Sequence, residues 1–154
     1  MSIPTDPPLG ASLPRQQTSS PRRRLQRLYS ALAVVFLLGV VVQVFLAGAG
    51  IFDSVSWLGY HAILGYSLTL IPLLMLILGL VGKLPRSVNW LTTLLLLLVY
   101  LQSLFIRIPH GLGVPILSAL HPVIALVIFT LPLYLIYNVR LIMRMPIEGD
   151  ADRD

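Results

Sequence analysis

Four long apolar runs, separated by short polar segments, dominate the pattern of hydrophobic and polar positions along the chain. They extend over residues 28–50, 57–81, 88–106 and 115–139, and none has an acidic or basic residue in its middle. Each is roughly 19–25 residues long, enough for an α-helix to cross a hydrocarbon layer about 30 Å thick. A segment in hydrocarbon must satisfy its own backbone hydrogen bonds, so the pattern predicts four transmembrane helices.

The connections between these runs are short, so sequential helices should be antiparallel neighbours. The predicted fold is therefore all-α: an integral membrane four-helix up-down bundle formed by residues 28–140. Residues 1–27 are rich in Pro, Ser, Thr and Gln and end in a basic cluster, which predicts a disordered N-terminal tail. Residues 141–154 are predicted to form a short acidic tail.

Lysine and arginine gather at one side of the predicted bundle. The N-terminal tail holds a cluster at residues 22–27, the second connection holds Lys83 and Arg86, and Arg140 and Arg144 follow the last run. Because cytoplasmic segments of membrane proteins are enriched in Lys and Arg, both termini are expected to be cytoplasmic, an N-in/C-in topology.

Composition restricts the chemistry that the chain can perform. It has no cysteine, which excludes disulfides, iron–sulfur clusters and covalently attached c-type haem. Charged residues make up 11% of the chain, and the apolar runs offer no carboxylate, Lys or Arg for a proton relay or a charged substrate. The basic cluster lacks accompanying aromatic residues, so no nucleic-acid partner is expected. An electron carrier or accessory subunit is favoured over an enzyme, a question that stays open.

Two histidines lie inside the predicted second and fourth helices. His61 and His121 are about four and six residues from the same end of the bundle, which places both roughly 6–9 Å below the membrane boundary. An ionisable side chain at this depth indicates a functional site. Gln43 and Gln102 lie at a similar depth on the other two helices, and the two Gln–His spacings differ by one residue. This similarity indicates an internal repeat of two hairpins.

Imidazoles that reach inward from diagonal helices can bind one haem iron from opposite faces. The sequence thus predicts haem b with bis-histidine ligation, and glutamines that orient the rings. Small residues one helical turn after each histidine would leave room for a flat macrocycle, and a cation near the boundary would suit its propionates. The predicted cofactor-binding residues are His61, His121, Gln43, Gln102, Gly65, Ala125 and Arg107, of which the two histidines bind the haem iron.

The bis-histidine interpretation predicts electron transfer, or a haem-bearing subunit of a membrane complex. The alternative is a non-enzymatic structural or assembly subunit without a cofactor, in which the His/Gln layer hydrogen-bonds across the bundle. Another tetrapyrrole, such as chlorophyll, is the alternative ligand. The expected partners are the lipid bilayer, and subunits of a membrane complex or a second copy of the chain. His110 is expected to lie in a connection and not to bind the iron.

Three stretches combine Gln or His with Gly, Ala or Pro in an apolar background: Gln43–Gly48, His61–Tyr66 and Leu120–Leu126. They resemble the signature of DUF6220, a small bacterial membrane protein family of unknown function. The resemblance extends over residues 28–140 and implies a four-helix, multi-pass protein of the bacterial inner membrane. The arrangement is also distantly similar to b-type haem membrane anchors and to one half of haem A synthase, in which histidines on membrane helices hold haem.

Overall fold

The computed structural model describes residues 21–144, apart from the side chains of residues 107 and 110. In the described part the chain is helical, without strands, and four of its segments are long and apolar enough to cross a membrane. The predicted all-α class with four spans is therefore confirmed. The elements are α1 (Pro21–Phe52), α2 (Trp57–Leu68), α3 (Leu70–Val81), α4 (Arg86–Gly111), the 3-10 helix η1 (Pro115–Ala119) and α5 (Leu120–Arg144).

The helices extend beyond the apolar runs. Residues 21–27, assigned above to a disordered tail, are the first turns of α1, and Pro21 suits the first helical position because its missing N–H is not needed there. Residues 141–144, assigned to the acidic tail, complete α5. The remaining parts of the two predicted tails, residues 1–20 and 145–154, lie outside the described residues.

The second span is divided at Thr69 into α2 and α3. The N–H of Thr69 bonds to the carbonyl of Tyr66 at 3.2 Å, a tighter turn than that of an α-helix. Pro72 has no N–H to bond to the carbonyl of Leu68, so the regular helical ladder is interrupted here. Pro72 therefore accounts for the division of this span.

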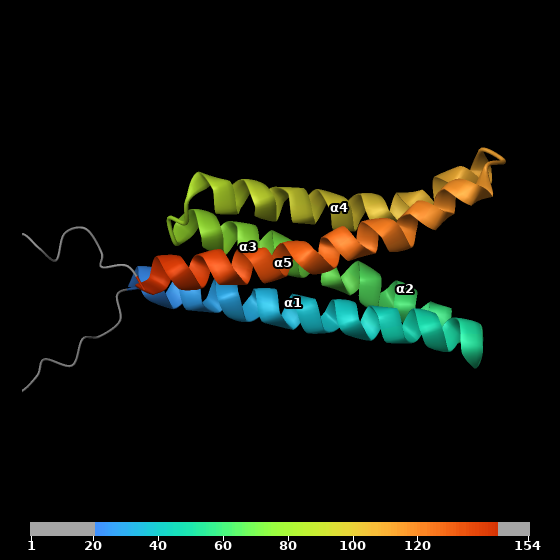
Figure 1. Cartoon of the computed structure of the whole chain (residues 1–154), viewed down its shortest axis with the longest axis horizontal. Coiled ribbons are helices and arrows are strands. Elements are labelled where there is room, and N and C mark those ends of the chain that lie inside the picture. Colours follow the sequence, from blue (N-terminus) through green and yellow to red (C-terminus); the bar gives the residue numbers. More distant parts are fainter. Residues whose placement is uncertain (1–20, 145–154) are drawn as a thin grey trace, which may run out of the picture.

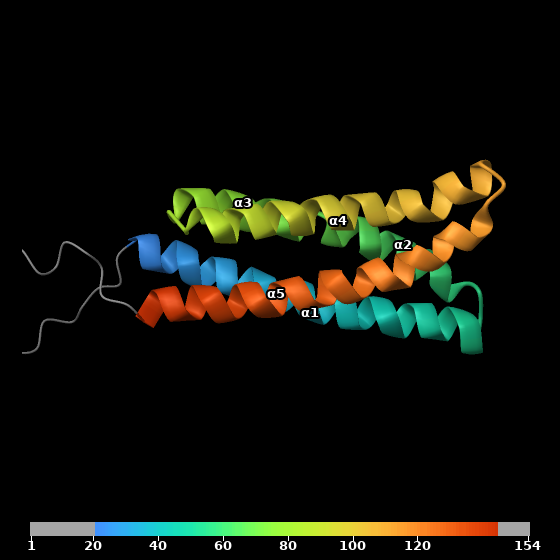
Figure 2. The same ribbon diagram turned by 45° about the horizontal axis from the view of Figure 1, so that its top comes forward.

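The four spans form a ring in which α1, the α2–α3 span, α4 and α5 each pack against the next. The helices converge at the end that carries Pro21, Arg144 and the α3–α4 turn, here called the terminal end (Figure 1). They diverge at the opposite end, the loop end, in two pairs (Figure 2). Among the described residues, the backbone of α2 lies close to those of α1 and α3 but not to those of α4 or α5. The loop end therefore consists of two diverging hairpins, α1–α2 and α4–α5.

The terminal half holds the best-packed part of the core. Tyr29 and Thr92 lie there without exposed surface, and their hydroxyl oxygens are 2.5 Å apart. Because Thr92 donates its own proton to the carbonyl of Val88, Tyr29 is the donor to Thr92. This bond joins α1 to the diagonal helix α4. The apolar side chains around it with 1% exposure or less are Ala33, Phe36, Met75, Leu95, Leu135 and Val139.

The turn between α3 and α4 is a Schellman motif with Lys83 in the left-handed conformation, φ 50°. Its two bonds run from Leu84 N–H to the Gly79 carbonyl at 2.8 Å and from Lys83 N–H to the Leu80 carbonyl at 3.2 Å. Side chains from the start of α1 bind the same turn.

Arg22 donates to the carbonyls of Gly82 and Lys83, and Gln26 donates to that of Gly82. Arg23 donates to the carbonyl of Met143 near the end of α5. Helix C-termini carry partial negative charge and unpaired carbonyls, so these contacts are favourable. The basic cluster therefore packs the terminal end of the bundle, in addition to the topological role that its charge predicts.

The second and fourth spans have the same burial pattern. Residues 61–80 and 121–140 agree in being buried, half-buried or exposed at every matched position except 76 and 136. Both segments begin with histidine and have proline at the matched positions 72 and 132. The agreement supports the internal repeat of two hairpins, related by a pseudo-two-fold axis between them.

Candidate functional site

A cavity of about 540 Å³ lies between the two hairpins in the loop half of the bundle. This volume is typical of a site for a small organic ligand. The lining is mainly apolar and comes from α1, α2, α4 and α5, with Phe36, Val40 and Ile128 at the border of the packed core. Its polar members are Gln43, His61, Tyr66, Gln102, Ser103 and His121.

Local structure at the loop end positions both histidines. Trp57 donates its indole N–H to the carboxylate of Asp53 at 2.7 Å, which fixes the start of α2 one turn before His61. His121 lies in the first turn of α5, directly after η1. Pro122 follows it, where a missing backbone N–H costs no helical hydrogen bond.

Each imidazole is bonded to the main chain of the other helix of its own hairpin. Nδ1 of His61 is 3.0 Å from the carbonyl oxygen of Gln43, and Nδ1 of His121 is 3.4 Å from that of Gln102. A carbonyl can only accept, so Nδ1 carries the proton in both rings. The other ring nitrogen, Nε2, then keeps a lone pair that can bind a metal.

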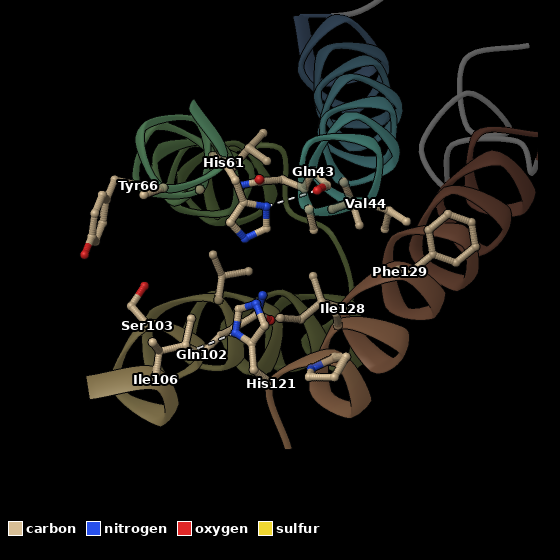
Figure 3. Close-up of a pocket in the computed structure, with 18 of the residues that line it drawn as sticks. Gln43, Val44, His61, Tyr66, Gln102, Ser103, Ile106, His121, Ile128 and Phe129 are labelled. Carbon is tan, nitrogen blue, oxygen red and sulfur yellow. Dashed lines mark hydrogen bonds between the residues drawn. The ribbon is translucent and has the colours of Figure 1, made fainter. Parts of the chain in front are cut away.

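The two rings lie opposite each other across the gap between the hairpins (Figure 3). Their centroids are 6.0 Å apart and their planes are inclined by 64°. His61 and His121 thus form a facing pair, contributed by the two diagonal spans as the sequence predicts.

The main chains and the side chains of the two glutamines differ in what they contact. Their main-chain carbonyls bind the histidines, whereas the side-chain Oε1 atoms of Gln43 and Gln102 are buried without a hydrogen-bond partner among the described residues. A Cβ atom added to Gly65 would lie only 2.7 Å from Nε2 of Gln43. Gly65 therefore makes room for the Gln43 amide, and it also lines the cavity. Ala125, at the matching position of the repeat, lines the same cavity.

The structure brings together six of the seven predicted site residues in one cavity. The seventh, Arg107, is in the last turns of α4, and its side chain lies outside the described part, as does that of His110. Tyr66 and Ser103 also line the cavity and are missed by the sequence analysis. Their positions in the sequence could have indicated them, because Tyr66 and Ser103 directly follow the predicted site residues Gly65 and Gln102.

The donor set limits the metals that this site can bind. Among the described side chains of residues 21–144 there is no group of three or more His, Cys, Asp or Glu that could hold a metal ion. Two imidazoles are two ligands short of a tetrahedral zinc site. They fit an iron whose remaining four ligands are the nitrogens of a macrocycle.

The hydrogen bonds of the polar layer stay within each hairpin. None of the described bonds connects Gln43 or His61 with Gln102 or His121. The cross-bundle network that a purely structural layer predicts is therefore not seen among the described residues.

Residues 43–108 match the profile of DUF6220, described as a family of unknown function. The match starts at Gln43, contains His61 and Gln102, and ends in α4. It confirms the resemblance for the motifs Gln43–Gly48 and His61–Tyr66, whereas the motif Leu120–Leu126 lies outside the match. No curated protein and no solved structure gives a significant match, so the similarity to b-type haem anchors stays a prediction.

Proposed function

We propose that this chain, similar over residues 43–108 to DUF6220, is an integral membrane haem b protein with His61 and His121 as axial ligands. The facing imidazole pair, with ring centroids 6.0 Å apart, is the observation that carries the proposal. A metal held by both rings would be about 2 Å from each bound nitrogen, and a separation of this size would leave room for it. The spacing of the pair therefore suits one iron between the rings.

The residues around the pair support the same assignment. The carbonyls of Gln43 and Gln102 hold the Nδ1 protons, which fixes the tautomer and raises the basicity of Nε2. The walls of the cavity around the rings are mainly apolar. Ala47, Ala62 and Ala125 line the cavity with small side chains, which leaves space for a flat ligand.

A haem with two imidazole ligands supplies one-electron transfer and has no open position for oxygen. The function proposed is thus electron transfer, or a haem-bearing subunit of a membrane complex, and not oxygen chemistry. The chain's own contribution is to orient the two imidazoles and to surround the site with apolar side chains.

The proposed location is the bacterial inner membrane, with both termini in the cytoplasm. The distribution of basic residues supports it, because Lys83, Arg86, Arg140 and Arg144 lie at the terminal end together with the cluster at residues 22–27. At the loop end, the α1–α2 connection contains Asp53 and no basic residue.

The optical spectrum of the protein purified from haem-replete cells tests the proposal. The reduced protein is expected to show the bands of low-spin haem b, and His61→Ala or His121→Ala should abolish them. His110→Ala is the matched control and should keep them. Haem-free wild-type protein would refute the assignment, and extraction of a different pigment would identify another tetrapyrrole.

A structural or assembly subunit is the second candidate function. It is favoured by the carbonyl bonds of both histidines, which satisfy one nitrogen of each ring without any ligand. In that case, replacing both histidines with glutamine leaves the melting temperature unchanged, and added haemin has no effect. A haem protein is instead stabilised by haemin, because a ligand that binds only the folded state raises its stability, and the double variant loses this gain.

A further inference from the structure

A second, smaller cavity of about 320 Å³ lies at the opening between α2 and α4. It adjoins the histidine cavity, because Tyr66 and Ser103 line both. Figure 3 shows these two side chains on the same side of the histidine pair, with their hydroxyl groups directed into the opening. Four of its five lining residues carry hydroxyl groups: Tyr66, Thr69, Tyr100 and Ser103, with Leu104 the fifth.

The internal repeat supplies a comparison for this polar opening. When the two hairpins are aligned on their glutamines and histidines, the α2–α4 opening corresponds to the opening between α1 and α5. All four hydroxyl-bearing residues are then replaced by apolar ones, so the fold itself does not require hydroxyl groups at such an opening. The corresponding residues are Leu126 for Tyr66, Phe129 for Thr69, Val41 for Tyr100 and Val44 for Ser103.

The depth of the hydroxyl groups is unusual for a membrane helix. Tyr66 and Thr69 follow Trp57 by about 14–18 Å along the helix axis, close to the middle of a bilayer. Tyrosines of membrane proteins concentrate at the interface instead. Tyr66 is nevertheless 53% exposed and Tyr100 is 63% exposed.

None of the described hydrogen bonds involves the hydroxyl groups of Tyr100 or Ser103. Thr69 donates to the carbonyl of Gly65 at 3.4 Å. Hydroxyl groups facing hydrocarbon have no water to bond, which is energetically unfavourable unless a ligand supplies acceptors. Such a ligand must itself dissolve in the bilayer.

We propose that the α2–α4 opening binds the ring of a lipid-soluble quinone, with Tyr100 and Ser103 donating hydrogen bonds to its carbonyl oxygens. A quinone combines a flat ring with acceptors, and its apolar tail can remain in the bilayer. Tyr66 and Leu104 provide apolar surface for the ring, and the cavity places it next to the histidine pair. The redox role of this quinone site rests on the proposed function, since the quinone would be the membrane-soluble partner of the haem.

Equilibrium dialysis of a decyl-substituted benzoquinone against the full chain in phospholipid nanodiscs tests the binding directly. Saturable binding is expected. Tyr100→Phe and Ser103→Ala should each raise Kd by about two- to tenfold, because each removes one hydrogen bond. Ser103→Val gives the opening the residue found at the matching position 44, so it should fold normally and also bind more weakly.

Two control variants remove hydroxyl groups that lie elsewhere on the bilayer-facing surface. Ser67→Ala and Thr130→Val delete exposed hydroxyl groups that bond only to their own helices, at 3.0 and 2.8 Å. Both should leave Kd unchanged. An equal loss of binding in the controls, unchanged binding in Tyr100→Phe and Ser103→Ala, or no saturable binding would overturn the proposal.

The haem absorption of the same samples separates the two proposals. Quinone binding without haem would refute the proposed function alone, whereas haem without quinone binding would refute this inference alone.

A second copy of the chain is the alternative occupant of the opening. Because the chain has no cysteine, Ser103→Cys introduces a single thiol, and its efficient oxidation to a disulfide-linked dimer would show that another copy covers the opening and overturn the inference.

Discussion

Tyr29 and Thr92 are joined by a hydrogen bond of 2.5 Å between two fully buried side chains on the diagonal helices α1 and α4. The bond crosses the centre of the terminal half, where all four spans are packed together. It lies between the two hairpins, whereas the bonds of His61 and His121 stay within one hairpin each. The terminal half is therefore where polar contacts as well as packing hold the hairpins together.

Tyr29→Phe should lower the free energy of unfolding by about 0.6–1.7 kcal/mol, the range of hydrogen bonds in membrane proteins. The ring stays in place, and Thr92 keeps its bond to the carbonyl of Val88. Tyr137→Phe is the control, because Tyr137 is 63% exposed. Equilibrium unfolding in mixed detergent micelles measures the difference, and equal stability of the two variants would contradict the prediction.

Gly65→Ala should lower the free energy of unfolding by about 1–3 kcal/mol, because the new methyl group overlaps the Gln43 amide and overpacks the site. Displacing Gln43 also moves the carbonyl that holds His61, so haem content should fall. Gly59→Ala is the matched control on α2, since nothing lies within 4 Å of its Cβ position. Thermal unfolding and haem absorbance are the measurements, and a Gly65→Ala protein that behaves like Gly59→Ala would disprove the role of Gly65.

Lys83→Gly should be more stable than Lys83→Ala by about 1 kcal/mol, because a left-handed backbone conformation is unfavourable for every residue with a Cβ atom. Both substitutions remove the same charge, so the comparison isolates the backbone term. Denaturant titration of the two variants measures it. A more stable alanine variant would show that Lys83 is not held in this conformation.

Reporter fusions at Asp53 and at Pro85 should report opposite sides of the membrane, with Pro85 on the cytoplasmic side. The expectation follows from the basic residues of the terminal end and their scarcity near Asp53. Removing the charges of Lys83 and Arg86 together should weaken the preference for this orientation. If both fusion sites reported the same side of the membrane, the four-span topology would be contradicted.

The four spans and the histidine pair could be predicted from the sequence for simple physical reasons. Hydrocarbon demands long apolar helices, and short connections make His61 and His121 enter the bundle from the same end. The rotation of each helix about its axis is not visible in such a pattern. The depth of Gln43 and Gln102 could therefore be predicted, but the pattern does not show that their main-chain carbonyls are the groups that contact the histidines.

The start of α1 could not be predicted from local preferences. Arginines in the first turn of a helix oppose its dipole, so residues 22–27 are typical of a tail. Their favourable contacts are tertiary, because Arg22 and Arg23 bind carbonyls near the ends of α3 and α5. The opening between α2 and α4 is missed for a related reason, since it depends on how far the two hairpins diverge.

That divergence gives the chain the mechanics of a lever. The packed residues of the terminal half are its fulcrum, and the two arms beyond it contain α2 and the start of α5 (Figure 1), the helices that carry His61 and His121. A small rotation at the fulcrum, such as one caused by a change of volume at Leu95, becomes a larger displacement at the rings. The distance between the imidazoles of His61 and His121 therefore depends on side chains of the terminal half that do not contact the histidine site.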